Sequence, residues 1–465
     1  MHYLRTLGCT STTGIAGVSI LVGAILLCAE AFAAPQAATT LTSQAQDPNH
    51  SSVAPQTITL QDALQRAKSN SPEFQAALTE FGLAREDRVQ SRAALLPSVT
   101  YNGGFIYTQG NGTSAGRYIA NNGVHEYISQ GNAHQVVSYG DVADFRRARA
   151  VEAAAHAKAE IASRGLVATV VKLYYGLLVA ERKYATSQRA SGEAQHFLEI
   201  SQKLEKGGEV AHSDVVKAQL QSQQQSRDLQ EAQLSMETAR LDLAILLFPD
   251  FNQNFTVVDD LQSAQAVPTF EEAQTMAAKG NPVLREALAN FQAAKHEVQV
   301  AWGGIMPTLA VDYFYGIDAT HYAVSQYDPV SGQNIRNLGY QASATLQLPV
   351  WNWGAGRSKI KQADLREHQS QVELTFAQKQ ALSNLREFYS EVQTSRGELE
   401  SLNQSAELAA ESLRLTNLRY QAGEATVLEV VDAQNALTQA RNAADDGQAR
   451  FRLAVSNLQT LTGNF

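Results

Sequence analysis

The sequence contains an internal repeat of two copies, and each copy contains a long run without proline. "LQDALQRAKSNSPEFQAALTEF" begins at residue 60 and "FEEAQTMAAKGNPVLREALANF" begins 210 residues later, at residue 270, with no gap needed to align them. Further on, "GGEVAHSDVVKAQ" from residue 207 matches "AGEATVLEVVDAQ" from residue 422, an offset of 422 − 207 = 215. Self-similarity at a fixed period indicates a repeated structural unit. The chain is therefore expected to fold as two equivalent halves, 57–260 and 261–465.

Each half has the same predicted order of elements: a helix, a strand, a loop, a return strand, a very long helix and a returning helix. In the first half the helices are predicted at about 60–95, 142–206 and 212–248, and the strands at about 98–109 and 125–139. In the second half the helices are predicted at about 270–305, 358–421 and 427–462, and the strands at about 308–317 and 338–350. Proline punctuation and two-residue alternation support these assignments.

The long helical runs exclude an ordinary compact domain. Sixty-odd residues at 1.5 Å per residue make a rod of about 95 Å, long enough to cross a cellular compartment. Each rod ends at glycine, Gly207-Gly208 or Gly423, which is a common helix stop. The returning helix carries a heptad seam of small residues that lets helices pack closely side by side. The seam comprises Ala433, Leu437, Ala440, Ala444, Gly447, Phe451, Ala454, Leu458 and Leu461. A soluble coiled coil is the alternative interpretation of this seam.

The strand before the second long helix has two different faces. Residues 340, 342, 344, 346 and 348 are aromatic or aliphatic, and residues 341, 343, 345 and 347 are Gln, Ser and Thr. About ten alternating residues match a tilted strand that crosses an outer membrane, with lipid on one face and a water-filled lumen on the other. Trp351 and Trp353 follow, where an aromatic girdle would lie at the membrane interface. An antiparallel sheet on a soluble core would also alternate.

The N-terminus predicts export. Residues 1–33 have a positive Arg5, an apolar stretch over 15–27 and a small-x-small cleavage site, as in a signal peptide. The apolar stretch is shorter than the roughly 20 residues that span a bilayer; a membrane anchor and a lipoprotein site at Cys28 are the alternatives. Cys9 and Cys28 would leave with the signal, and residues 34–56 are expected to be a disordered lead-in. No later segment has 18 uninterrupted apolar residues, so no transmembrane helix is expected.

Four strands cannot form a closed barrel. Unpaired backbone groups at an open sheet edge cost several kcal/mol each in lipid, and the smallest single-chain barrels have eight strands. The chain is therefore expected to contribute its strands to a barrel shared by several copies.

Several segments resemble the repeated signatures of the TolC-like outer-membrane efflux proteins. They are "ITLQDALQRAKSNSPEF", "ALLPSVTYNGGF", "LPVWNWGAGRSKI" and "RYQAGEATVLEVVDAQNAL", and the resemblance runs from about Thr57 to the C-terminus. It implies a mainly α fold with a β-barrel part, in which three copies share a twelve-stranded barrel in the outer membrane of a Gram-negative bacterium. It also implies a periplasmic α-helical tube and docking to an inner-membrane pump through a periplasmic adaptor protein.

The resemblance also implies a constriction at the periplasmic end of the tube. The family's two pore-facing acidic positions match Glu429 and Asp432, and its tyrosine near the tip matches Tyr420. Acidic rings of this kind favour cations. The family often has a basic residue at the position of Ala425, and its absence leaves open how the constriction is held closed. Two solvated helix charges are the alternative interpretation, and Tyr420 is equally compatible with simple packing.

Other implied positions lie in the first half and at the hairpin tips. The first-half match to Glu429 is Asp214, and the match to Asp432 is Lys217. An adaptor would dock at the hairpin tips, which are represented by Gly208, Val210, Gly423 and Ala425.

The remaining residue patterns exclude several classes of function. The net charge of −9 is spread along the chain without a basic stripe, which argues against nucleic-acid binding. No catalytic, cofactor-binding or metal-binding constellation is predicted, and His212 is interpreted as a solvated residue rather than a ligand. The leading hypothesis is a passive exit duct for drugs or other small molecules. A duct for type I protein secretion and a structural coiled-coil protein of the envelope are the alternatives.

Overall fold

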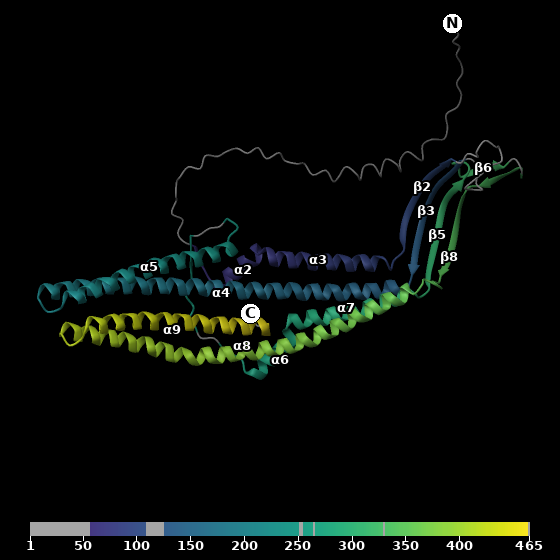
Figure 1. Ribbon diagram of the computed structural model, residues 1–465. Helices are drawn as coiled ribbons and strands as arrows, with labels where there is room; N and C mark the ends of the chain where they lie inside the picture. Colours follow the sequence, from purple (N-terminus) through teal and green to yellow (C-terminus); the bar gives the residue numbers. More distant parts are fainter. Residues whose placement is uncertain (1–55, 108–124, 251–253, 264–265, 329–330, 464–465) are drawn as a thin grey trace, which may run out of the picture. The chain divides into compact units, whose positions relative to one another are not determined.

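The computed structural model describes residues 56–107, 125–250, 254–263, 266–328 and 331–463 (Figure 1). The predicted signal peptide and almost all of the predicted lead-in lie outside this part of the chain; only Gln56 is described, at the start of β1. Both halves have the predicted order of helices and strands. The two short strands β1 (Gln56–Ile58) and β4 (Phe255–Val257) were not anticipated.

The first helix of each half is broken in two, so the prediction of single helices over 60–95 and 270–305 is wrong. The first half has α2 (Leu60–Asn70) and α3 (Pro72–Ala93), and the second has α6 (Phe270–Gly280) and α7 (Pro282–Gly303). Ser71 and Asn281 have extended backbones, and their side chains accept N–H bonds from the next helix. A proline at the first position of a helix lacks the N–H that would continue the preceding one, so each helix ends and a new one begins.

Four strands form one antiparallel sheet in the order β2-β3-β5-β8, so that the two halves join at its centre. The strands are β2 (Ser98–Tyr107), β3 (His125–Val137), β5 (Thr308–Ala319) and β8 (Leu338–Gln347). Tyr315 lies opposite Tyr340, on the face that carries the apolar side chains. His134 and Asp312 lie opposite each other on the other face, with 2.6 Å between Nδ1 and Oδ1. The expected two-faced sheet is present, and its apolar side chains are exposed in the single chain.

The predicted loop between the second pair of strands is not purely irregular. It contains a small hairpin, β6 (Ser325–Asp328) paired with β7 (Gln333–Arg336). The alternation there is too short to be recognised beside the glycine and proline of "YDPVSGQN".

Four long helices follow the strands as two antiparallel hairpins. The first hairpin is α4 (Tyr139–Lys206) with α5 (His212–Leu247), and the second is α8 (Ala355–Gln421) with α9 (Val427–Thr462). α4 also packs against α3, α7 and α9 (Figure 1). α4 and α7 approach closely at Gly140 and Gly303, where a Cβ on Gly303 would lie 2.4 Å from the Gly140 Cα. At 1.5 Å per residue, α4 and α8 are each about 100 Å long.

Of the described helices, α4 alone is long and apolar enough to cross a membrane by length and composition, with a mean hydropathy of 1.3 in its most apolar window. About 44% of that window is buried. The middle of α4 supplies the largest core cluster, in which Tyr174, Leu177 and Val170 are fully buried against α2, α5, β1 and β4. Packing therefore accounts for the apolar character of α4.

Tyr174 connects three segments of this core. Its hydroxyl donates to the Val258 carbonyl at 2.7 Å and lies 3.3 Å from the Ile58 carbonyl, next to the parallel strands β1 and β4. Burial raises the pKa of the Tyr174 phenol, so it stays protonated as the donor.

Tyr174→Phe should remove this bond and keep the ring. The partly buried Val258 carbonyl then loses this donor, and we expect the free energy of unfolding to fall by about 1–2 kcal/mol. Thermal denaturation of the purified protein checks this. The matched control is Tyr184→Phe. Tyr184 lies further along α4, and among the described residues its side chain makes no such bond to β1 or β4. Equal midpoints for the two variants would contradict the prediction.

Candidate functional site

The two hairpin tips have the same backbone turn. Gly208 and Gly423 have positive φ angles of 81° and 77°, which glycine adopts without strain. The following N–H groups, of Glu209 and Glu424, donate to carbonyls five residues back at 2.9 and 2.8 Å. This is the Schellman ending of a helix, which satisfies its last carbonyls. Both glycines are exposed, as expected of a tip.

The two tips differ in how the returning helix begins. In the second hairpin, Thr426 accepts from the Glu429 N–H, and the Glu429 carboxylate accepts from the Thr426 N–H, which makes a capping box. In the first hairpin the corresponding cap residue is Ala211, which offers no side-chain bond. The second tip is therefore the better anchored of the two.

Glu429 has a cationic partner that the sequence analysis missed. Arg419, one turn before the tip, lies 3.2 Å from the Glu429 carboxylate and also donates to the Glu424 carbonyl at 3.1 Å. The Thr426 backbone N–H, with further help from the Thr426 hydroxyl and Arg419, lowers the pKa of Glu429 below its usual value of 4.5. A basic residue at position 425 is thus not needed to pair with Glu429, because Arg419 reaches it across the turn.

Asp432 lies one turn further along α9 and is exposed, as Glu429 is. Among the described residues no cation lies within ion-pair distance of Asp432. Its first-half counterpart Lys217 pairs with Asp214 at 3.2 Å, so that the two charges offset each other. The four charged positions near the tips are Asp214, Lys217, Glu429 and Asp432. Of these, Asp432 is the one whose charge has no partner within the described residues.

Tyr420 is buried and joins the two hairpins. Its exposed fraction is 5%, and its ring centroid lies 4.9 Å from that of Phe197 on α4. Its hydroxyl lies 3.1 Å from the buried Ser201 hydroxyl. We call the surrounding group the tip cluster. It contains Phe197, Leu198, Val215, Ala218, Tyr420, Val427 and Val430, which come from all four long helices. Within one chain, Tyr420 therefore packs between the hairpins.

The remaining predicted residues are divided between interior and surface. Val210 and Ala425 are partly buried against the tip cluster. They therefore contribute to the packing inside the tip more than to its exposed surface. His212 lies 2.7 Å from a Glu205 carboxylate oxygen, and no group that could hold a metal ion occurs in the described part of the chain.

The two tryptophans lie between β8 and α8, far along the sequence from the tips. Trp351 and Trp353 are 75% and 89% exposed, with ring centroids 5.8 Å apart. Trp353 has a positive φ of 54°, and Gly354 after it has 81°. The positive φ angles of Trp353 and Gly354 turn the chain from the sheet into α8.

The capping box makes the second tip sensitive to acid. Because folding lowers the pKa of Glu429, its contribution is fully present above about pH 4.5 and is lost as the pH falls through the lowered value. We expect amide protection in residues 427–431 to be constant at neutral pH and to decline in acid, measured as protection factors by hydrogen exchange. Glu429→Gln keeps a capping group without a carboxylate, so its protection should not depend on this pH range. Protection that rises in acid would contradict the prediction.

Comparisons with known proteins find a family that matches both halves of the chain. The family model described as "outer membrane efflux protein" matches residues 63–247 and 274–464. The alkaline protease secretion protein AprF of Pseudomonas aeruginosa is 22% identical over 424 residues, covering 87% of this chain and 84% of the relative. The outer membrane protein TolC of Escherichia coli is 21% identical, covering 87% and 82%.

The fold agrees with solved structures as well. The Campylobacter jejuni CmeC outer membrane channel has a TM-score of 0.74 at 15% identity, covering 87% of this chain and 85% of that one. The open state of the Neisseria gonorrhoeae MtrE outer membrane channel has a TM-score of 0.70 at 19% identity, covering 87% and 88%. At these identities the structures establish a shared fold.

Proposed function

Because the chain belongs to the outer membrane efflux protein family, we propose that it is the passive exit duct of a tripartite efflux system. In this proposal three copies form one channel through the outer membrane and the periplasm. The duct conducts drugs or other small molecules when an inner-membrane pump and a periplasmic adaptor are docked to it.

The observation that carries the proposal is the four-stranded sheet with two unpaired edges. Within the described residues, β2 and β8 each pair on one side only. In lipid, each unpaired backbone group costs several kcal/mol, so the edges need partners. Three copies that join β8 to the next β2 would close a barrel of twelve strands. The face with Tyr315 and Tyr340 would meet lipid, and the face with His134 and Asp312 would meet water.

The helices support a continuous duct. Each strand pair leads into a helix of about 100 Å, and α4 and α8 each have their hairpin tips at the far end from the sheet. Three copies would bring three Glu429 and three Asp432 carboxylates to the narrow end. Such a ring favours cations over anions.

A duct for secreted proteins remains the second candidate. The relatives include a protease secretion protein, AprF, and also a pyoverdine export protein, OpmQ of Pseudomonas aeruginosa, which is 23% identical over 87% of this chain. Relatives of this chain are therefore named for a protein cargo and for a small-molecule cargo. The docked partner distinguishes the two for this chain.

The test is photo-crosslinking in living cells from the hairpin tips. Glu209 and Glu424 follow the tip glycines and are exposed, whereas the neighbouring Val210 and Ala425 pack inwards. A photoreactive amino acid at either position should capture a periplasmic adaptor, identified by mass spectrometry. The pump that co-purifies with that adaptor then separates drug efflux from protein secretion. Gln230, exposed in the middle of α5, is the control position and should not capture the adaptor.

Capture of nothing but further copies of this chain from both tips would rule out docking at the tips. The shared barrel is tested separately, by migration of the purified protein as a trimer that dissociates only on heating. A monomer in mild detergent would contradict the barrel.

A further inference from the structure

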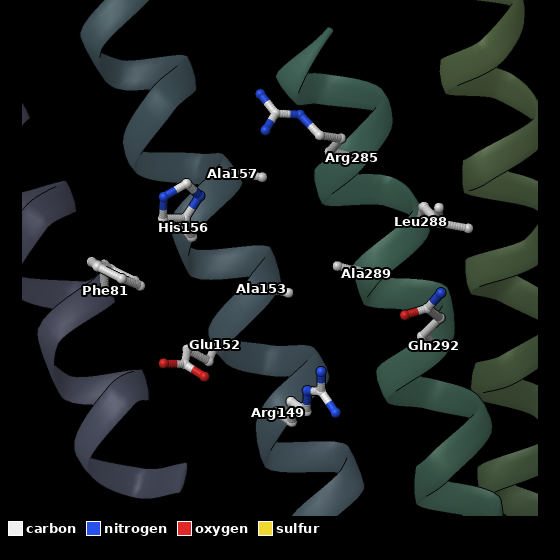
Figure 2. A pocket seen from close by; sticks show the side chains of 10 residues that line it. All are labelled: Phe81, Arg149, Glu152, Ala153, His156, Ala157, Arg285, Leu288, Ala289 and Gln292. Atoms are coloured by element: carbon white, nitrogen blue, oxygen red, sulfur yellow. The ribbon is translucent and has the colours of Figure 1, made fainter. Parts of the chain in front are cut away.

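We propose that a groove between α3, α4 and α7 is a binding site for a small organic anion with a flat apolar body. The groove has a volume of about 540 Å³, within the range of pockets that hold drug-sized ligands. It is formed by three helices that are neighbours in one chain, so the site is complete without a second copy. We call it the α3–α4–α7 groove (Figure 2).

The floor of the groove is apolar. Ala153 and Ala157 point from α4 towards α7, and Ala289 points back towards α4 (Figure 2). Phe81 on α3 forms one wall, and its ring meets the His156 ring edge-on at a centroid distance of 5.2 Å. Small side chains beside an aromatic wall leave a slot that suits a planar ring.

Among the charged side chains that line the groove, one cation has no ion-pair partner within the described residues. Glu152 pairs with Arg88 at 2.7 Å, and Arg285 shares the Glu160 carboxylate with Arg164, so each of these groups already has an ion-pair partner. Arg149 lines the groove and is exposed, and no carboxylate of the described residues lies within ion-pair distance of it. A guanidinium presents a planar fork of donors that fits a carboxylate, sulfonate or phosphate. The anionic group of the ligand would therefore lie at Arg149, and its body would lie on the alanines.

The second half of the chain lacks these features, so the groove is not a general consequence of the repeat. Counting 215 residues along from α4, Arg149 corresponds to Asp364 on α8, and Ala153 and Ala157 correspond to His368 and Val372. The equivalent place thus has the opposite charge and larger side chains. Only the first half combines a free cation with a floor of small residues.

The experiment is calorimetric titration of the purified full-length protein in lipid nanodiscs, with 2-naphthalenesulfonate as the probe and empty nanodiscs as the blank. We expect saturable binding to the wild type. Arg149→Gln should weaken it about tenfold by removing the charge-assisted bonds. Ala153→Leu should weaken it by a similar factor by filling the floor, and the exposure of Ala153 makes this change tolerable to the fold. The neutral probe 2-naphthol should bind the wild type and Arg149→Gln equally.

Arg146→Gln is the matched control, since Arg146 lies one turn away on α4, is also exposed and does not line the groove. It should bind the probe as the wild type does. Heat no greater than that of empty nanodiscs, or equal affinities for Arg149→Gln and Arg146→Gln, would overturn the proposal. The measurement needs no transport, so its outcome is independent of whether the protein is an exit duct.

Discussion

Tyr420→Ala is expected to separate the two hairpins at their tips. The change removes a ring that is 5% exposed from the tip cluster and deletes its contact with Phe197. Removing a buried aromatic side chain costs about 3–5 kcal/mol. Tyr420 is the only aromatic side chain that the second hairpin contributes to this cluster, and the bonds from Gln221 and Gln225 to Asn435 also join the hairpins. We therefore expect a large local loss, seen as faster amide exchange in residues 197–220 and 420–431.

Tyr420→Phe is the matched control. It keeps the ring against Phe197 and loses the bond to Ser201, at a cost of about 1 kcal/mol. In the proposed trimer, loosened tips widen the narrow end of the duct, so single-channel conductance in planar bilayers should rise strongly for Tyr420→Ala and little for Tyr420→Phe. Equal conductance and equal exchange in the two variants would show that the ring does not hold the tips together.

Asp432→Asn is expected to remove most of the cation affinity of the proposed constriction. Glu429 is next to Arg419 at 3.2 Å, whereas no described cation accompanies Asp432. Three uncompensated charges in a narrow ring attract a multivalent cation far more than three compensated ones. Block of the channel by spermidine, a trivalent cation, should weaken about tenfold or more in Asp432→Asn and only about two- to threefold in Glu429→Gln.

Arg419→Gln completes this comparison, because it leaves both carboxylates in place and removes the compensating cation. Spermidine should block this variant more tightly than the wild type. Bilayer recordings at several spermidine concentrations give all three affinities. If Glu429→Gln has the larger effect, Glu429 is the dominant pore charge and its pairing with Arg419 is broken in the assembled channel.

Local signals in the sequence were sufficient to predict most of the architecture. The two halves, the strand order within each half and the long helices follow from repetition, alternation and runs without proline, all of which can be read directly along the chain. The breaks at Ser71 and Asn281 carried a readable signal as well. A cap residue directly before proline favours the start of a new helix over the continuation of the old one.

The missed features depend on contacts that no local pattern encodes. Packing of Tyr420 was one of the two interpretations of the sequence, but its partners Phe197 and Ser201 lie more than two hundred residues earlier and could not be predicted. The pair of Arg419 and Glu429 spans ten residues across a turn whose geometry sets the distance. The strands β1 and β4 pair across about two hundred residues and have only three residues each, too few for alternation to be visible.

The way the core of α4 is completed has a consequence for how the chain folds after export. The largest cluster includes Ala449 of α9, and Arg164 of α4 donates to the carbonyls of Gly280 and Thr460 at 2.8 and 2.7 Å. Translocation delivers a polypeptide from its N-terminus, so Gly280 emerges 116 residues after Arg164 and Thr460 emerges 296 residues after it. Until then the apolar middle of α4 has no complete set of neighbours. We therefore expect α4 to be accessible to a protease in the newly exported chain until α9 has arrived.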